Sequence, residues 1–412
     1  MKKQDIEKLS PNIKETDLWS DAESEYSFLF SNEMMPDFLR FGAKPLTNKQ
    51  FTDELKKLVK NYPFYYPAYL DMGCRLLIID IEQAKKALDI GFEIAIKISS
   101  WEVIDLDYDI VFENMEKLFH PELVVHYAMK LIEKFPDKAV HYDSAAYALA
   151  TMGEKEKALE FGIKAVELNP KNSYYLNNLG MCYLELNRFD EAEKYFKLSI
   201  NADKNHKNPV NNLADCLQMK ALGVSNTEFS LLPFDMKKIE ELEKQHDSDD
   251  LHNYVNRVNL LKLTVFKETL LKKSQNSVNG LNSLIKTLKG FFNFIDSISD
   301  EYFIWEEIVH LQINFEQIMN MFIIKHSNVD DDILDELYQS IYQYYGFLSE
   351  NNIVKKVKFD EFKKYADSLK PGLFDKMHKY NLVRNGIGKN AQKKQEILHE
   401  LFNDDHLREY IF

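Results

Sequence analysis

Apolar residues recur every three or four positions along most of this chain, which is the period of an amphipathic helix. Four long runs carry the pattern in the second half of the chain: residues 253–273, 281–298, 302–326 and 333–350. Residues 51–63 show it over a shorter stretch. No long alternating run of β-branched residues with hairpin turns interrupts these segments. The pattern predicts an all-α fold, and 13 Gly and 11 Pro in 412 residues agree with it.

Between residues 139 and 206 the pattern repeats with a period of 34 residues. Aligned pairs are Tyr142 and Leu176, Ala145 and Leu179, Ala146 and Gly180, Leu149 and Tyr183, Ala158 and Ala192, and Ala165 and Ser199. The small residues of this set would let two helix axes approach within about 8–10 Å. Gly153 and Asn187 fall at the expected turn after each first helix, and both tolerate left-handed backbone.

This period and order of residues resembles the tetratricopeptide repeat, whose unit is a pair of antiparallel helices. Leu176, Leu179-Gly180 and Tyr183 match the family's first helix, and Ala192, Phe196 and in part Ser199 match its second. The first row ends in Leu-Asn-Pro at 168–170, as the family's rows usually do. The second row departs from the family, because Lys204 stands where proline is expected. The resemblance implies a superhelical array of helical hairpins.

More than two units are expected, because at least three such hairpins are normally needed to bury their faces. Residues 66–98 and 105–138 fit divergent units, and 207–223 supply one further first helix without a matching second helix. We therefore predict a helical cap over 1–50, an array over 51–223, a charged connector over 224–250 and a helical bundle over 251–412. Within the cap, Asp21 is the expected N-cap of a short helix that Pro36 ends.

The resemblance implies that a peptide lies along the face made by the first helices. Asn178 and Asn212 occupy the position at which many family members hold the peptide backbone, and an amide offers both a donor and an acceptor. Ser144 occupies it one unit earlier. The predicted peptide-binding residues are Asn178, Asn212, Asn177, Asn211, Tyr147 and Met181. The alternative is that these side chains only solvate the helices. The Lys and Arg that clamp a terminal carboxylate are absent, since Asp143, Asn177 and Asn211 stand at one of their positions.

Residues 378–390 of the C-terminal region resemble the signature of HEPN domains, helical bundles often found in RNA-targeting proteins. Arg384-Asn385 match the signature, but Lys389 replaces its histidine, and lysine is a poor base near neutral pH. The resemblance implies RNA binding more than cleavage, with Arg384, Asn385, Lys389, Lys393 and Lys394 as candidate contacts. Residues 353–395 hold eleven Lys and one Arg against four acidic residues. This charge fits a phosphate-binding surface or an acidic protein partner, and it also fits a solvated helical face or a basic patch that docks onto the acidic array of the same chain.

Composition narrows the remaining classes of function. The net charge of −14 argues against general nucleic-acid affinity. No signal peptide and no apolar run of about 18 residues is evident, so we expect a cytoplasmic protein without a membrane partner. Cys74, Cys182 and Cys216 lack metal-binding spacing and are expected to be buried thiols. The carboxylates at 330–332 fit a helix start better than a calcium loop.

No catalytic residue, metal or cofactor is expected. The leading prediction is a non-catalytic adaptor or scaffold that binds a protein or peptide in the array. The alternative is an HEPN-like RNA-binding or ribonuclease module that the array regulates. A third possibility is a structural subunit of a larger complex.

Overall fold

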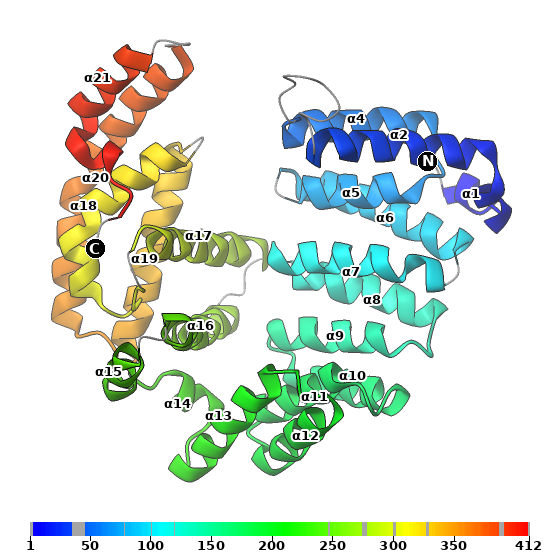
Figure 1. The fold of residues 1–412 in the computed structure, drawn as a ribbon, viewed down its shortest axis with the longest axis horizontal. Helices are drawn as coiled ribbons and strands as arrows, with labels where there is room; N and C mark the ends of the chain where they lie inside the picture. The colour runs from blue at the N-terminus through cyan, green and yellow to red at the C-terminus, as the bar shows by residue number, and fades with distance from the viewer. Residues whose placement is uncertain are drawn as a thin grey trace. The chain divides into compact units, whose positions relative to one another are not determined.

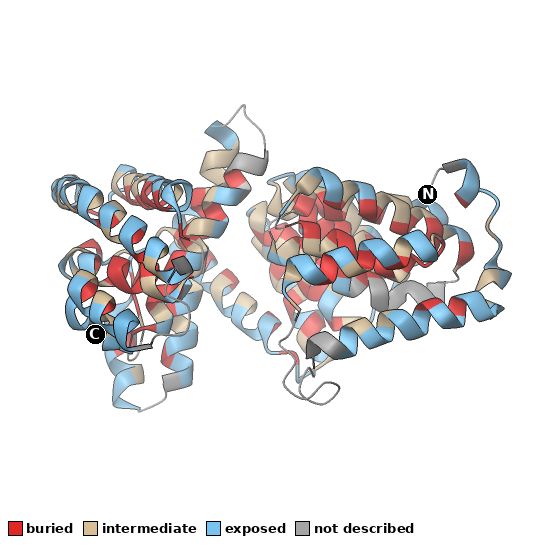
Figure 2. Cartoon of the chain, turned by 90° about the horizontal axis from the view of Figure 1, so that it is seen from above, coloured by how far each residue is buried: buried red, intermediate tan, exposed pale blue. Residues whose placement is uncertain are grey.

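The computed structural model describes residues 3–34, 46–77, 79–99, 101–118, 120–245, 248–273, 278–299, 302–326, 329–386 and 391–410. All regular structure in these ranges is helical, which confirms the predicted all-α class (Figure 1). The chain divides into two compact units, Met1–Ala221 and Leu222–Phe412, and each has its own buried interior. Figure 2 shows that buried positions line one side of most helices and that the opposite side is exposed.

The first unit is a succession of helices joined by short turns. They are α1 (Lys3–Ile6), η1 (Pro11–Glu15), α2 (Asp17–Met34), α4 (Asn48–Asn61), α5 (Tyr66–Leu76), α6 (Ile81–Ile98), α7 (Trp101–Lys117), α8 (Pro121–Lys134), α9 (Ala139–Thr151), α10 (Lys155–Leu168), α11 (Ser173–Glu185), α12 (Phe189–Ala202) and α13 (Asn208–Leu222). Three closely packed hairpins stand out: α5 with α6, α9 with α10, and α11 with α12. The next helix, α14 (Asn226–Ser230), is short and belongs to the second unit, so α13 lacks a full second helix.

Close approach within the hairpins depends on the small residues. Ala146, Ala158 and Ala192 are fully buried. A Cβ atom added to Gly180 would lie 2.6 Å from a ring carbon of Phe196, so only glycine fits this contact without a shift. Gly153 and Asn187 end the first helices with φ of 80° and 59°, as the alignment predicted.

Large aromatic residues fill the core around α6, α7 and α8, where Phe112 and Val124 stand at the positions that Ala146 and Ala158 hold in the next unit. Phe92 of α6 stacks on Tyr108 of α7 at 4.9 Å and on Tyr127 of α8 at 4.1 Å between ring centroids. The ring centroid of Phe112, four residues after Tyr108 on α7, lies 6.2 Å from that of Phe92. The rings fill the wider space between helices, which explains how a divergent unit keeps its core.

Helix α2 has a different N-cap from the one predicted. Helix α2 begins at Asp17, so Asp21 lies inside it and does not cap it. Thr16 takes that role, because its hydroxyl accepts a hydrogen bond from the backbone N–H of Trp19 at 3.3 Å. Pro36 lies outside the described residues.

The second unit contains the remaining helices. They are α15 (Met236–Lys244), α16 (Ser248–Lys273), α17 (Val278–Ser297), α18 (Ile308–Lys325), α19 (Asp331–Glu350), α20 (Lys356–Gly386), α21 (Ala391–Phe402) and η2 (Asn403–Leu407). Phe292 and Trp305 stack at 4.4 Å at the centre of an aromatic core. In the segment predicted as a charged connector, Ile239 of α15 is buried with Val255 and Ile304. Helix α15 therefore packs onto the second unit.

One predicted helical stretch in this unit is wrong. Residues 302–307 are not helical, although their apolar pattern continues into α18. The side chain of Asn259 takes the place of helical hydrogen bonds: it donates to the carbonyl of Phe303 at 2.9 Å and accepts from the N–H of Trp305 at 3.1 Å. A side chain from α16 therefore satisfies the buried backbone, which the local sequence does not reveal.

Replacing Gly180 by alanine tests the close contact in the repeat core. We expect Gly180→Ala to lower the free energy of unfolding by about 1–3 kcal/mol, because the fully buried ring of Phe196 must move. The matched control is Gly290→Ala on α17, where a Cβ meets no atom within 4 Å and alanine favours the helix. Urea unfolding followed by circular dichroism measures both; equal stability of the two variants would contradict the packing argument.

Candidate interaction surface

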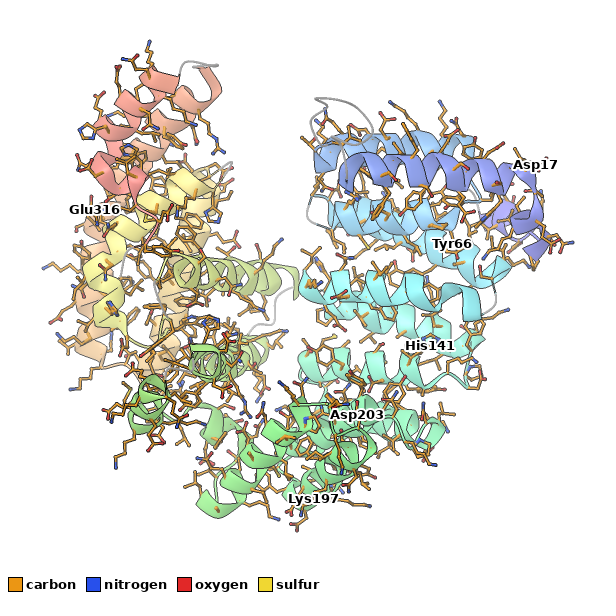
Figure 3. The ribbon with its side chains drawn as sticks, in the orientation of Figure 1. Asp17, Tyr66, His141, Lys197, Asp203 and Glu316 are labelled. Atoms are coloured by element: carbon orange, nitrogen blue, oxygen red, sulfur yellow. The ribbon has the colours of Figure 1, made fainter. Side chains whose placement is uncertain are left out.

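The first helices of successive units, α7, α9, α11 and α13, carry one set of mostly polar side chains. We call this set the first-helix face, and it comprises Glu113, Glu116, Asp143, Tyr147, Asn177, Asn178, Met181, Glu185, Asn211 and Asn212. Its residues share the face because they recur three or four positions apart along each helix. Figure 3 shows the helices with their side chains and labels His141, which is buried near the start of α9.

A chain of side-chain hydrogen bonds crosses three of these helices. The amide of Asn178 donates to both carboxylate oxygens of Asp143, at 3.2 and 3.0 Å. Asn177 donates to the amide oxygen of Asn178 at 3.4 Å. Asn212 donates to the amide oxygen of Asn177 at 2.9 Å. The chain therefore joins α13 to α11 and α11 to α9, and each bond between helices fixes their register.

The six predicted peptide-binding residues differ from one another in how far they are buried. Asn177 is buried and serves as the central link of the hydrogen-bond chain. Asn178 and Asn212 are half-buried, and Asn211 is exposed. Tyr147 is 51% exposed. Met181, one period after Tyr147, is half-buried. All six lie on first helices.

Two carboxylates on this face have strongly perturbed acidity. Burial raises the pKa of Asp143 to about 7, although the hydrogen bond from Asn178 opposes the rise. Burial also raises the pKa of Glu116 to about 7, and the nearby charges of Asp143 and Glu113 add to the effect. The sequence analysis named Asp143 only because it stands where a basic residue is expected, and it did not name Glu116. The available signal was the i, i+3 spacing of Glu113 and Glu116, which puts both on one face of α7.

A contact between Ser173, at the start of α11, and His206, in the segment after α12, has the residue types of a nucleophile and its base. Ser173 Oγ lies 2.7 Å from His206 Nδ1 and 2.9 Å from Ser199 Oγ. All three residues are buried, so no substrate reaches them in this arrangement. The contact ties the start of α11 to the end of α12 and to the segment after it.

Other candidate chemistry is structural in the described residues. Burial raises the pKa of the Cys182 thiol to about 12, which keeps it protonated. Asp330 caps α19 by accepting from the N–H of Ile333 at 3.0 Å. Within the described ranges no three His, Cys, Asp or Glu side chains gather as metal ligands do. Nor does any helix there combine the length and apolarity that crossing a membrane requires.

The candidate nucleic-acid residues are only partly described. Arg384 donates to the carbonyl of His326 at 2.9 Å and so caps the end of α18. Nothing is described of Lys389 or of the Asn385 side chain. Lys393 and Lys394 are exposed on α21. Several lysines between 353 and 395 form ion pairs: Lys356 with Asp360, Lys370 with Asp335, Lys376 with Glu316, and Lys379 with Asp375. These pairs offset part of the basic charge of the segment.

Comparison with known proteins places the repeats in a family. Two family models described as tetratricopeptide repeat match residues 142–172 and 163–194. This part of the chain is therefore an array of tetratricopeptide repeats, as its 34-residue period predicted, and such repeats generally bind proteins. The comparison with curated proteins found no match.

Among solved structures, the chain is similar to MamA, at 21% identity and a TM-score of 0.30 over 38% of this chain and 90% of that one. It is also similar to the tetratricopeptide domain of P58(IPK), at 13% identity and a TM-score of 0.22 over 85% of this chain and 98% of that one.

The raised pKa values make stability depend on pH. A carboxyl group whose pKa is higher in the folded state stabilises the protein below its unfolded pKa and loses that contribution as pH rises through the folded value. We expect wild type to be less stable at pH 8 than at pH 6. The double variant Glu116→Gln, Asp143→Asn should lose most of this difference. Urea midpoints of both proteins at the two pH values measure it; identical pH dependence in both proteins would refute it.

The Arg384 contact gives a separate prediction. Arg384→Ala should cost about 1 kcal/mol, because the last turn of α18 loses a charged donor to its terminal carbonyl. Amide hydrogen exchange near the C-terminal end of α18 should accelerate, while Lys394→Ala on α21 should leave it unchanged. Unchanged exchange in Arg384→Ala would show that the contact does not hold the helix end.

Proposed function

We propose that this protein is a non-catalytic adaptor whose first-helix face binds an extended segment of a protein partner. The observation that carries the proposal is Tyr147, a large aromatic side chain that is 51% exposed on that face. Ile110 of α7 is also 60% exposed. Exposed aromatic and apolar side chains surrounded by polar ones are typical of protein-binding surfaces.

The asparagines supply the polar part of such a contact. Asn212 uses one amide N–H in its bond to Asn177, and the group has a second N–H and a carbonyl oxygen by its chemistry. These can pair with a peptide bond of any sequence. Asn178 contributes mainly through Asp143, since its amide N–H groups already point at that carboxylate. The two asparagines therefore differ in role, although they hold the same position in the repeat.

Site-specific photo-crosslinking tests this surface. A photoreactive phenylalanine derivative replaces Tyr147 in the full chain, or replaces the exposed Lys157 of α10 as the control. We expect a discrete protein adduct from position 147 in host lysate and none from position 157. Competition with unmodified wild type should remove the adduct, whereas Tyr147→Ala, Asn212→Ala should compete at least tenfold less well. Adducts of equal yield from both positions would count against the proposal.

A further inference from the structure

We propose that the partner segment carries a lysine or arginine side chain that pairs with Glu116 of α7 and Asp143 of α9. The inference rests on the proposed function of the same face and names the chemistry of its occupant: a basic, extended peptide segment. Two acidic side chains on neighbouring first helices, close to an exposed tyrosine, make this the part of the face with the clearest chemical preference.

The first observation is the distribution of cations on the face. Glu113 pairs with Lys117 at 2.7 Å, and Glu185 lies 3.8 Å from Lys155. Glu116 and Asp143 differ from these two, because no described Lys, Arg or His lies within ion-pair distance of either carboxylate. The hydrogen-bond partner of Asp143 is the neutral amide of Asn178. Among the described side chains, the face therefore holds two carboxylates without a basic partner of their own.

The second observation is that these carboxylates affect each other across helices. Burial raises the pKa of Glu116 and the charge of Asp143 adds to the rise; burial likewise raises the pKa of the Tyr147 hydroxyl and the charge of Glu116 adds to it. Among the described ionisable groups, Glu113, Tyr147 and Cys182 interact electrostatically with the pair. Lys117 is paired with Glu113, and Lys155 lies near Glu185, whose charge also acts on Tyr147. Lys117 and Lys155 are therefore already within ion-pair distance of other carboxylates. The surroundings therefore leave unbalanced negative charge whenever Glu116 and Asp143 ionise.

A half-buried carboxylate without a cation costs free energy that folding alone does not recover. An incoming ammonium or guanidinium group removes that cost, because it supplies the missing positive charge. The exposed ring of Tyr147 adds to the preference, since a basic side chain can lay its methylene groups or its charge on an aromatic face. An acidic segment or a nucleic acid would meet repulsion at the same place.

Selection from a displayed library of random 16-residue peptides identifies the preference directly. The full-length wild type and the double variant Glu116→Gln, Asp143→Asn are the two targets. The control is Glu156→Gln, Glu160→Gln, which removes two exposed charges from α10 and keeps the first-helix face. We expect Lys or Arg enrichment on wild type and on the control, and loss of that enrichment on the double variant. Circular dichroism confirms that each variant is folded.

The pH dependence of one selected peptide then identifies the groups. The peptide pairs with ionised carboxylates, so raising the pH from 6 to 8 should strengthen binding by about tenfold for each group whose pKa is about 7. A second peptide, with glutamine in place of its basic residue, should bind at least tenfold more weakly and show little pH dependence. The double variant should bind both peptides alike at either pH.

The outcomes separate this inference from the proposed function. Peptides that enrich on wild type without Lys or Arg, and that Tyr147→Ala and Asn212→Ala weaken, would overturn the basic occupant and leave the adaptor function standing. If no peptide is enriched on wild type and position 147 forms no adduct in lysate, both fail together. A basic peptide that binds the double variant as tightly as wild type would place its cation elsewhere and overturn the inference.

Discussion

The first unit depends on how closely two helices can approach within a hairpin. At Gly180 the ring of Phe196 occupies the space where any other residue would carry its Cβ atom. Ala146 is buried at the position that matches Gly180, and Ala158 and Ala192 are buried at matching positions of the second helices, so they also allow close approach. Because this packing uses one side of each first helix, the opposite side can carry the polar side chains of the first-helix face. The packing thus sets where the interaction surface can be, and it does so with the smallest side chains in the chain.

The first-helix face combines order with unsatisfied charge. The asparagine chain from Asn212 to Asp143 satisfies amide groups with one another and holds the side chains in defined positions. The same chain presents Asp143 to an environment that lacks a cation. An ordered surface loses little conformational entropy when a partner binds. A carboxylate without a cation attracts a positively charged group of that partner. In the proposed interaction, rigidity and selectivity therefore arise from the same residues.

The sequence predicted those features that repeat and missed those that depend on a distant side chain. The period of 34 located the hairpins, and Gly153 and Asn187 marked their turns with the predicted left-handed backbone. Residues 302–307 were predicted as helix because no local signal announces Asn259, which lies more than 40 residues earlier. On the candidate surface, the pattern identified Asn178 and Asn212 but not their partners. Partners on neighbouring helices follow from the packing angle, which a single sequence does not contain.

The spacing of the hydrogen bonds on the face has a geometric consequence. Asp143 bonds to Asn178 and Asn177 bonds to Asn212, and both pairs are separated by 35 residues, whereas the repeat is 34 residues long. Each bond therefore advances one residue relative to the repeat, about 1.5 Å along a helix axis. The bond between Asn177 and Asn178 steps back by one residue within α11, so the advance does not accumulate and the chain of contacts returns to the same register in each unit. In the proposed interaction, a peptide segment that follows these contacts therefore meets each first helix at the same level of the repeat.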